Sequence, residues 1–232
     1  MKTILENLGL RLTDKQEKQF ADYMALLLAW NQKFNLTAIT DPEEVRIKHF
    51  YDSLLLTQAS LWSGKGRMAD LGSGAGFPGV PLKIICPELD MVLFEASAKK
   101  TEFLNMLCSE LGLEQITAVH ARAEDAGQNN QYRGRFDWVV SRAVAGISIL
   151  AEYSLPLLKL HGIMAAYKGP GYQAELDLAQ KALNRLGGTY LNTQVAELPK
   201  DFGQRSIIMI QKTAETPAAY PRKAGTPSKK PL

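Results

Sequence analysis

The spacing of hydrophobic positions divides the chain into three zones. In residues 1–63, apolar side chains recur every three or four positions, which is the spacing of helices with one buried face. Residues 64–212 alternate short apolar runs with helical patterns, and residues 213–232 contain four prolines and few apolar residues. The pattern predicts an N-terminal helical extension, an α/β domain, and a tail that is extended or disordered because proline excludes helix and sheet.

Two capped helices are expected in the extension. The first begins at Thr13 or Asp14, whose side-chain oxygens accept hydrogen bonds from the free N–H groups of a first turn. The second begins near Asp41, because Asp41, Pro42 and Glu44 have the spacing of a capping box with proline at the first helical position. The apolar faces comprise Phe20, Tyr23, Met24, Leu27 and Phe34, then Val45, Ile47, Phe50, Leu54, Leu55 and Leu61. This periodicity favours core packing over base stacking for the aromatic residues of the extension.

The central zone contains seven apolar runs of strand length. They lie at 67–71, 91–95, 116–120, 136–141, 162–168, 189–195 and 206–212, with helical patterns at 79–86, 98–112, 147–159 and 171–187. Strands that alternate with helices form βαβ units, in which the strands run parallel and the helices cover the sheet. We therefore predict a Rossmann-like α/β fold with a mostly parallel seven-stranded sheet and helices on both faces.

The segment after the first predicted strand carries the strongest chemical signal. The strand ends at Asp70, and Gly72, Gly74, Gly76 and Gly79 follow. Glycines let the backbone turn sharply and approach a ligand at the carboxyl ends of the strands. The last three match the GxGxxG pattern of dinucleotide binders, which is weak by itself. The competing interpretation starts at Asp70 and has the acid-x-GxGxG form usual in methyltransferases, where the loop wraps the methionine and ribose of S-adenosylmethionine.

Two further turns agree with a nucleoside site. The second predicted strand ends in Glu95, where a carboxylate can accept hydrogen bonds from both ribose hydroxyls. The turn after the third strand contains Ala123 and Glu124, whose backbone and side chain can read the amine and ring nitrogens of an adenine. Each turn alone is a weak signal because acidic residues are common after strands.

The charge distribution points to a polyanionic partner. The formal net charge is +3, and residues 211–232 contain five basic residues and one acid, so the excess positive charge lies in the tail. Extended basic tails bind polyanions such as nucleic acids. The tail residues expected to bind phosphates are Arg222, Lys223, Lys229 and Lys230.

Other residue types mostly exclude functions. No run of 18 apolar residues and no secretory signal occurs, so we expect no membrane span and a cytoplasmic location. Cys86 and Cys108 lie outside any CxxC pair and are interpreted as reduced core thiols. The three histidines lie too far apart in the sequence for metal-ligand spacing. We interpret Asn35 and His49 as polar anchors between the extension and the core, without chemistry.

The ordered set of motifs resembles the small-subunit ribosomal RNA guanine-N7 methyltransferase G family, also called glucose-inhibited division protein B. The resemblance covers nearly the whole chain, including the glycine loop, the Phe-Pro-Gly-Val-Pro stretch after it, and the tail from Tyr220 to Leu232. The matching segments are residues 30–37, 41–42, 49, 52–54, 70–81, 99–100, 103–104, 110–113, 136–137, 141–143, 168–169 and 220–232.

This resemblance implies a class I methyltransferase that transfers a methyl group from S-adenosylmethionine to N7 of guanine-527 in 16S ribosomal RNA. Its partner would be that RNA or the small ribosomal subunit, and we expect a monomer without metal. Together with the loop motif, it assigns the cofactor to Asp70, Gly72, Gly74, Phe77, Glu95, Ala96, Ser97, Ala123, Glu124 and Arg142. The chain departs from many relatives at Glu95, where they have Asp, and after Arg205, where they have His.

Guanine N7 carries an in-plane lone pair and no proton, so its methylation needs no general base. We expect catalysis by alignment, with Arg142 as a positioning candidate between cofactor and base. The alternative interpretation of Arg142 is a structural arginine that pairs with Asp137 or Glu124. Lys168, at the end of the fifth predicted strand, is a candidate phosphate contact, although a solvated lysine is nearly as good an interpretation.

Two other functions stay open on the residues alone. One is an NAD(P)-dependent oxidoreductase that uses the same glycine loop, although the chain offers no paired Tyr and Lys as a proton donor. The other is an RNA-binding assembly factor without catalysis. Binding of S-adenosylhomocysteine or NADH separates the first from a methyltransferase, and methyl transfer into RNA separates the second.

Overall fold

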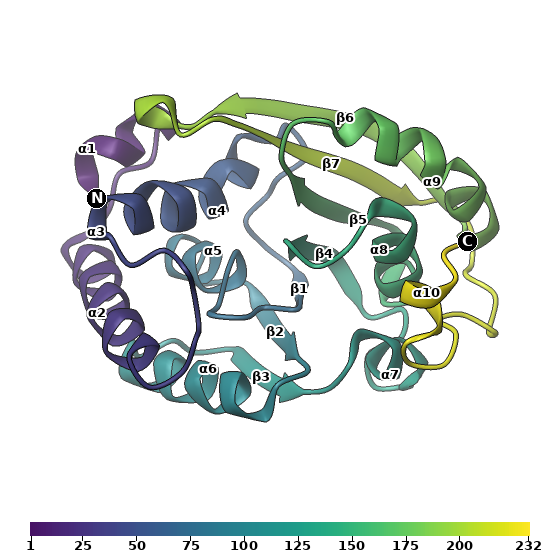
Figure 1. The fold of residues 1–232 in the computed structure, drawn as a ribbon, viewed down its shortest axis with the longest axis horizontal. Helices are drawn as coiled ribbons and strands as arrows, with labels where there is room; N and C mark the ends of the chain where they lie inside the picture. Colours follow the sequence, from purple (N-terminus) through teal and green to yellow (C-terminus); the bar gives the residue numbers. More distant parts are fainter.

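The computed structural model describes residues 1–232, apart from the side chains of Lys2 and Thr3. A seven-stranded sheet forms its centre, with strand order β3-β2-β1-β4-β5-β7-β6 (Figure 1). The strands are β1 (Arg67–Leu71), β2 (Asp90–Glu95), β3 (Ile116–His120), β4 (Phe136–Arg142), β5 (Leu158–Lys168), β6 (Gly188–Glu197) and β7 (Gln204–Lys212). β1 to β5 pair in parallel, whereas β7 runs antiparallel to both β5 and β6. The predicted fold class is confirmed.

Helices cover both faces of the sheet and divide the core in two. The helices of the α/β domain are α5 (Gly79–Ile85), α6 (Ala98–Glu110), α7 (Ala123–Gln128), α8 (Ile147–Ser154) and α9 (Tyr172–Leu186). One apolar cluster joins α5, α6 and the extension, and the other joins α7, α8 and α9. The predicted helix at 147–159 ends earlier, at Ser154, because the chain enters β5 at Leu158. The short α7 was not predicted.

The extension packs into the same core as α5 and α6. Its helices are α1 (Lys2–Leu5), α2 (Asp14–Asn31), α3 (Pro42–Glu44) and α4 (Asp52–Leu54), with a 3-10 turn at Glu6–Leu8, a π-helical stretch at Val45–Tyr51 and a second 3-10 turn at Leu55–Gln58. Both predicted caps are present, since Thr13 accepts from the N–H of Gln16 and Asp41 accepts from those of Glu43 and Glu44. The predicted apolar faces are largely buried, but Leu61 is 48% exposed.

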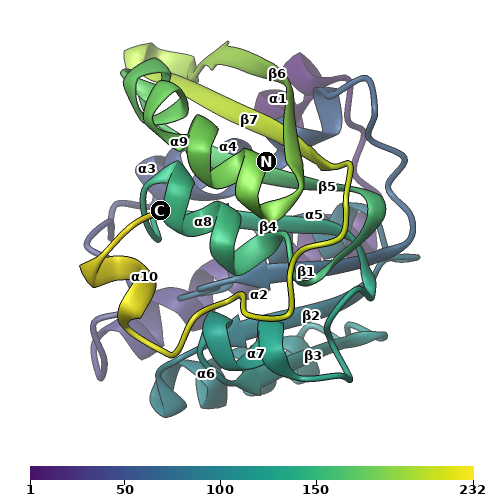
Figure 2. The ribbon, with the colours of Figure 1, turned by 90° about the vertical axis from the view of Figure 1, so that its right-hand side faces the viewer.

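The tail is folded, so the expectation of an extended or disordered segment is wrong. Residues 213–225 run along α7 and α8 and lead into a short helix, α10 (Thr226–Lys229) (Figure 2). Pro221 and Pro227 are buried, and Pro227 stands in the first turn of α10, where its fixed φ suits a helix. We propose that the N-terminal extension ends at residue 63 and that the α/β domain ends at residue 212. Across the described residues, no helix is long and apolar enough to cross a membrane.

Candidate functional site

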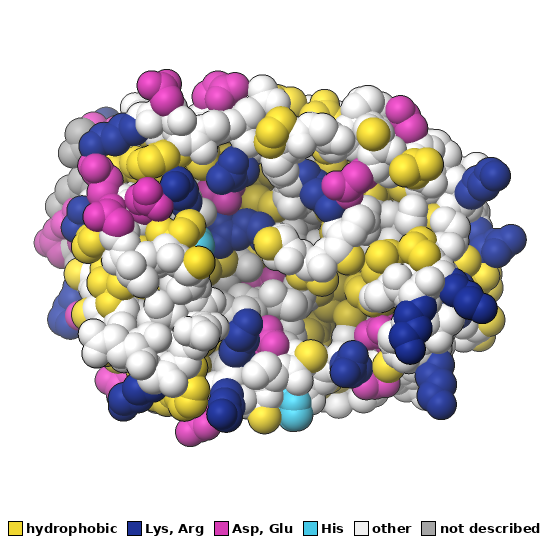
Figure 3. Space-filling view, in the orientation of Figure 1, with side chains coloured by type: hydrophobic (Ala, Val, Ile, Leu, Met, Phe, Trp, Pro, Cys, Tyr) yellow, Lys and Arg dark blue, Asp and Glu magenta, His cyan; other side chains and the backbone are white. Residues whose placement is uncertain are grey.

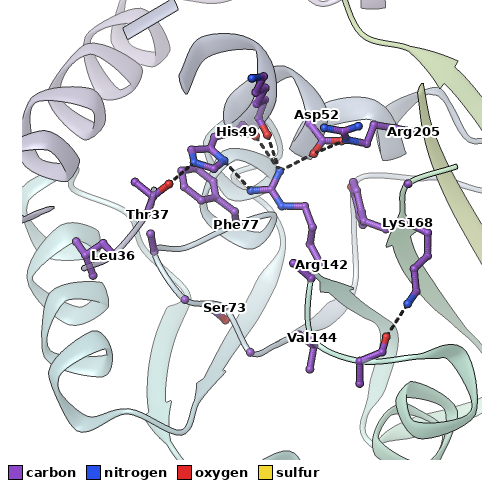
Figure 4. Close-up of a pocket in the computed structure, with 18 of the residues that line it drawn as sticks. Leu36, Thr37, His49, Asp52, Ser73, Phe77, Arg142, Val144, Lys168 and Arg205 are labelled. Carbon is purple, nitrogen blue, oxygen red and sulfur yellow. Dashed lines mark hydrogen bonds and ion pairs between the residues drawn. The ribbon is translucent and has the colours of Figure 1, made fainter. Parts of the chain in front are cut away.

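A cavity of about 750 Å³ opens where the carboxyl ends of β1, β4 and β5 face the extension (Figure 4). Here the strand order reverses direction between β1 and β4, which is where doubly wound sheets bind ligands. The lining comprises Leu36, Thr37, Lys48, His49, Asp52, residues 72–75, Phe77, Lys100, residues 142–146, residues 167–169, Glu175 and Arg205. Five lining side chains are cationic and two are anionic, and Figure 3 shows Lys and Arg side chains around this hollow. The cavity therefore favours an anionic ligand.

The extension holds the glycine loop in place. The hydroxyl of Tyr23 in α2 donates to the carbonyl oxygen of Ala75 at 2.6 Å, and its ring stacks on Phe77 with centroids 5.3 Å apart. Gly76 has φ +101°, and a Cβ atom there would lie 2.6 Å from the Tyr23 hydroxyl. Only glycine allows this turn and this close approach, which explains one glycine of the predicted motif.

Asp70 and Glu95 bond different backbone N–H groups of the segment that follows β1. Asp70 is fully buried, and its carboxylate accepts from the N–H of Gly79 at 2.9 Å. Burial raises the pKa of Asp70 to about 7. The hydrogen bond between Asp70 and Gly79 joins β1 to α5 behind the cavity. The Glu95 carboxylate accepts from the N–H of Gly74 at 2.9 Å and from that of Ser97 at 2.8 Å, so the structure brings these three predicted cofactor residues together.

The predicted adenine turn lies one strand further along the same edge. The N–H of Ala121 donates to the carbonyl oxygen of Glu95 at 3.0 Å, which places the turn after β3 beside the Glu95 turn. Ala123 and Glu124 begin α7 and are not part of the cavity lining. Glu124 is buried and accepts from the N–H of Gly225 in the tail at 2.8 Å.

Arg142 connects the end of β4 to the extension. It donates to the carboxylate of Asp52 at 2.8 Å, to the carbonyl oxygen of Lys48 at 3.2 Å and to Nδ1 of His49 at 3.3 Å. Its guanidinium also lies over the Phe77 ring, 5.0 Å from the centroid. The structural partners suggested for Arg142 from sequence, Asp137 and Glu124, are wrong: Asp137 pairs with Lys159, and Arg142 pairs with Asp52.

His49 is a neutral residue of the cavity wall. Arginine has no acceptor, so Nδ1 of His49 accepts from Arg142, and the proton stands on Nε2, which donates to the Thr37 hydroxyl at 2.7 Å. Burial, followed by the charge of Arg142, lowers the pKa of His49 to about 3. Its expected anchoring role agrees with these contacts. Asn35 is exposed, and Asn31 instead makes the polar bonds to Leu36 and Thr37.

Five charged residues of the cavity were not predicted as site residues: Lys48, Asp52, Lys100, Glu175 and Arg205. Asp52 is 2% exposed and lies in the buried helical segment of the extension. Arg205, at the start of β7, places its Nε 3.5 Å from the same carboxylate oxygen that Arg142 contacts. One signal was available in the sequence, because Asp52 is an acidic residue on an otherwise apolar helical face.

The predicted RNA contacts separate into two groups. Lys168 lines the cavity but is not a solvated lysine, since it pairs with Glu175 at 2.6 Å and donates to the carbonyl oxygen of Ala145 at 2.6 Å. None of the four tail cations lines the cavity. Arg222 pairs with buried Glu152, whereas the other three are exposed: Lys223, Lys229 and Lys230.

Neither cysteine lines the cavity. Cys86 and Cys108 are both free thiols, as predicted, and burial raises the pKa of Cys108 to about 12, so it stays protonated. Among the described residues, no group of three or more His, Cys, Asp or Glu side chains is arranged to hold a metal ion.

The mostly parallel seven-stranded sheet with helices on both faces is the Rossmann-like fold of class I S-adenosylmethionine-dependent methyltransferases. Solved structures with the same fold include a predicted O-methyltransferase, protein Atu636 from Agrobacterium tumefaciens, at TM-score 0.54 and 17% identity, covering 70% of this chain and 81% of that one. Another is TYW2 from P. horikoshii in complex with MeSAdo, at TM-score 0.56 and 9% identity, covering 72% and 63%. At these identities the likeness shows the fold alone.

Sequence comparison identifies the family. The family model for GidB, rRNA small subunit methyltransferase G, matches residues 16–208. The ribosomal RNA small subunit methyltransferase G of Lactobacillus johnsonii is 47% identical over 230 residues, covering 98% of this chain and 96% of that protein. The protein of the same name from Alkaliphilus metalliredigens is 44% identical over 227 residues, covering 98% and 95%. The chain belongs to the rRNA small subunit methyltransferase G family.

Proposed function

We propose that this chain transfers a methyl group from S-adenosylmethionine to N7 of a guanine in the 16S ribosomal RNA of the small subunit. One observation carries the proposal: a single cavity joins the glycine loop, which Glu95 braces, to a cationic and aromatic wall formed by Arg142 and Phe77. Family membership supports the RNA substrate, and the family resemblance supplies the choice of N7.

The hydrogen-bond acceptors of Glu95 fit the ribose of a nucleoside. Each Glu95 carboxylate oxygen accepts one backbone N–H, and lone pairs remain on both oxygens for the two ribose hydroxyls. TYW2 from M. jannaschii, solved in complex with AdoMet, shares this fold at TM-score 0.51. When bound, S-adenosylmethionine supplies an activated methyl group together with its leaving group.

The chain's own contribution is alignment. Guanine N7 attacks without losing a proton, so no side chain has to act as a base. Phe77 and the neutral ring of His49 stack with centroids 4.5 Å apart and offer an apolar face beside the loop, while Arg142 offers donors for the guanine O6 or a phosphate. Holding N7, carbon and sulfur in line can contribute about 7–11 kcal/mol in favourable intramolecular reactions.

The substrate base must leave its stack to reach the cavity, because N7 faces the deep groove of A-form RNA. We therefore propose a loop or an extruded base as the target, with Lys168 and Arg205 as candidate phosphate contacts at the cavity edge. We further propose that the protein is a monomer in the cytoplasm, and the cytoplasmic location agrees with its free thiols.

The deciding experiment incubates undermethylated small-subunit RNA, and particles that contain it, with tritiated methyl donor. Label in one guanine, mapped by primer extension after cleavage at 7-methylguanine, is the expected result. RNA binding without label transfer would instead favour an assembly factor. Isothermal titration with S-adenosylhomocysteine and NADH tests the oxidoreductase alternative, which predicts binding of NADH only.

A further inference from the structure

The C-terminal tail is fastened to α7, the helix that begins at the predicted adenine turn. Arg133 follows α7, and its guanidinium donates to the carbonyl oxygens of Gly127 at 2.9 Å, Tyr220 at 2.7 Å and Thr216 at 2.9 Å. Gly127 also lacks a side chain where the tail passes, since a Cβ atom there would lie 2.5 Å from Cγ of Pro221. The turn of α7 and the tail are therefore shaped to fit each other.

An ion pair between Arg222 of the tail and buried Glu152 of α8 holds the next part of the tail in place. Arg222 surrounds the carboxylate of Glu152 with three donors: its backbone N–H at 2.8 Å, Nε at 2.9 Å and a terminal nitrogen at 2.7 Å. Glu152 is fully buried, and a buried carboxylate is stable only with such partners. Arg222 is thus engaged with the protein and is not a free cation of an RNA arm.

Three residues beyond Arg222, the tail contacts Glu124 itself. The N–H of Gly225 donates to Oε1 of Glu124 at 2.8 Å, and the Tyr153 hydroxyl reaches the same oxygen at 3.3 Å. Tyr153 in turn bonds the Ser228 hydroxyl of α10 at 3.1 Å. Across the described residues no donor bonds Oε2, which leaves that oxygen for a further donor.

From these contacts we infer that residues 214–232 position Glu124 for the adenine of the methyl donor, so that tail docking and donor binding stabilise each other. This inference rests on the proposed function, because it concerns the adenine end of the same site. It assigns Arg222, Tyr153 and Gly225 as positioning residues that act through Glu124. It also predicts reciprocity, since a tail that strengthens donor binding must itself be stabilised by the donor.

The test compares two variants that each remove one positive charge from the tail. Arg222→Met should weaken S-adenosylhomocysteine binding at least fivefold by isothermal titration, with Arg222→Lys between it and the wild type. Lys223→Met, the exposed neighbour, should stay within twofold. Under saturating RNA, Arg222→Met should raise KM for S-adenosylmethionine more than it lowers kcat. Wild-type affinity in folded Arg222→Met, or an equal loss in Lys223→Met, overturns the inference.

Two further measurements cover the case in which Arg222→Met does not fold. Tyr153→Phe keeps the Arg222 ion pair and removes one bond to Glu124, so it should weaken S-adenosylhomocysteine binding by about two- to tenfold. In the wild type, S-adenosylhomocysteine should slow amide exchange in residues 214–232. Unchanged affinity in Tyr153→Phe together with unchanged exchange contradicts the inference. A wild-type protein that does not bind S-adenosylhomocysteine at all contradicts the proposed function instead.

Discussion

The carboxylate of Asp52 lies 2.8 Å from a guanidinium nitrogen of Arg142, although the two residues are 90 positions apart in the chain. Asp52 comes from the helical extension, and Arg142 ends β4 in the sheet. Arg205 approaches the same carboxylate oxygen at 3.5 Å. One buried anion therefore fixes the positions of two cations on the wall of the cavity.

Removing this anion should impair RNA methylation more than donor binding. Asp52→Asn keeps the shape of the side chain but releases both guanidinium groups, and a displacement of about 1 Å at a positioning group can cost on the order of 100-fold in rate. We expect turnover to fall about 10- to 100-fold while S-adenosylhomocysteine affinity stays within about threefold. Asp22→Asn, at an exposed surface pair with Lys18, is the control. Equal losses in turnover and donor affinity would contradict the expectation that Asp52 matters more for methyl transfer to RNA than for donor binding.

The hydroxyl of Tyr23 should matter for both stability and donor affinity. Tyr23→Phe leaves the carbonyl oxygen of Ala75 without its partner, which costs about 1–3 kcal/mol for a buried acceptor. We expect a lower midpoint in urea denaturation and weaker S-adenosylhomocysteine binding, because the glycine loop loses a fixed point. Tyr190→Phe, whose hydroxyl bonds Thr193 near the surface, serves as the matched control and should change neither quantity.

His49 should make the fold sensitive to mild acid. Its pKa is lowered to about 3 in the folded state, so between pH 7.5 and 5 the unfolded chain takes up a proton there and the folded chain does not. Stability is therefore lost as pH falls through the unfolded pKa, by at most about 2 kcal/mol over this range. His49→Gln should show a shallower decline than the wild type in denaturation series at pH 7.5, 6 and 5. Parallel curves would show that His49 is protonated in the folded state.

The exposed tail lysines should contribute to RNA affinity through charge alone. Besides the Lys and Arg side chains around the cavity, a second group of them lies at the right-hand end of the face in Figure 3, over α9 and α10. Changing Lys223, Lys229 and Lys230 to Gln together should reduce the slope of log affinity against log salt by about 2 if all three contact phosphates. A triple variant at the exposed Lys18, Lys65 and Lys159 removes the same charge elsewhere and should keep the slope.

The sheet, and the meeting of the glycine loop with Glu95 at one edge of it, could be predicted because their signals are local. Each strand is a short apolar run between turns, and Gly74 and Glu95 each stand directly after a strand, so topology alone brings them to one rim. The helix α7 was missed because its six residues, which include Gly127, are too few to show a helical period. The same locality explains why the caps at Thr13 and Asp41 were found.

The tail and the cationic wall depend on contacts that no local pattern contains. The prolines indicate that strand pairing does not continue into the tail. The burial of Pro221, however, depends on its contact with α7, which lies much earlier in the sequence. In the sequence Arg222 looks like an unpaired cation, because its partner Glu152 belongs to a different segment of the chain. Likewise, Asp52, Arg142 and Arg205 come from three separate segments, and only the folded chain shows that they share one carboxylate oxygen.

The antiparallel direction of β7 determines which of its residues reaches the cavity. A strand that enters a parallel sheet backwards starts at the rim where its neighbours stop, so Arg205 reaches the cavity from a hairpin otherwise distant from the glycine loop. Side chains alternate between sheet faces, and a slip of one residue in the β6–β7 pairing would turn Arg205 to the opposite side. A shift in the pairing of this peripheral hairpin would therefore remove the Arg205 charge from the cavity without a change in the glycine loop.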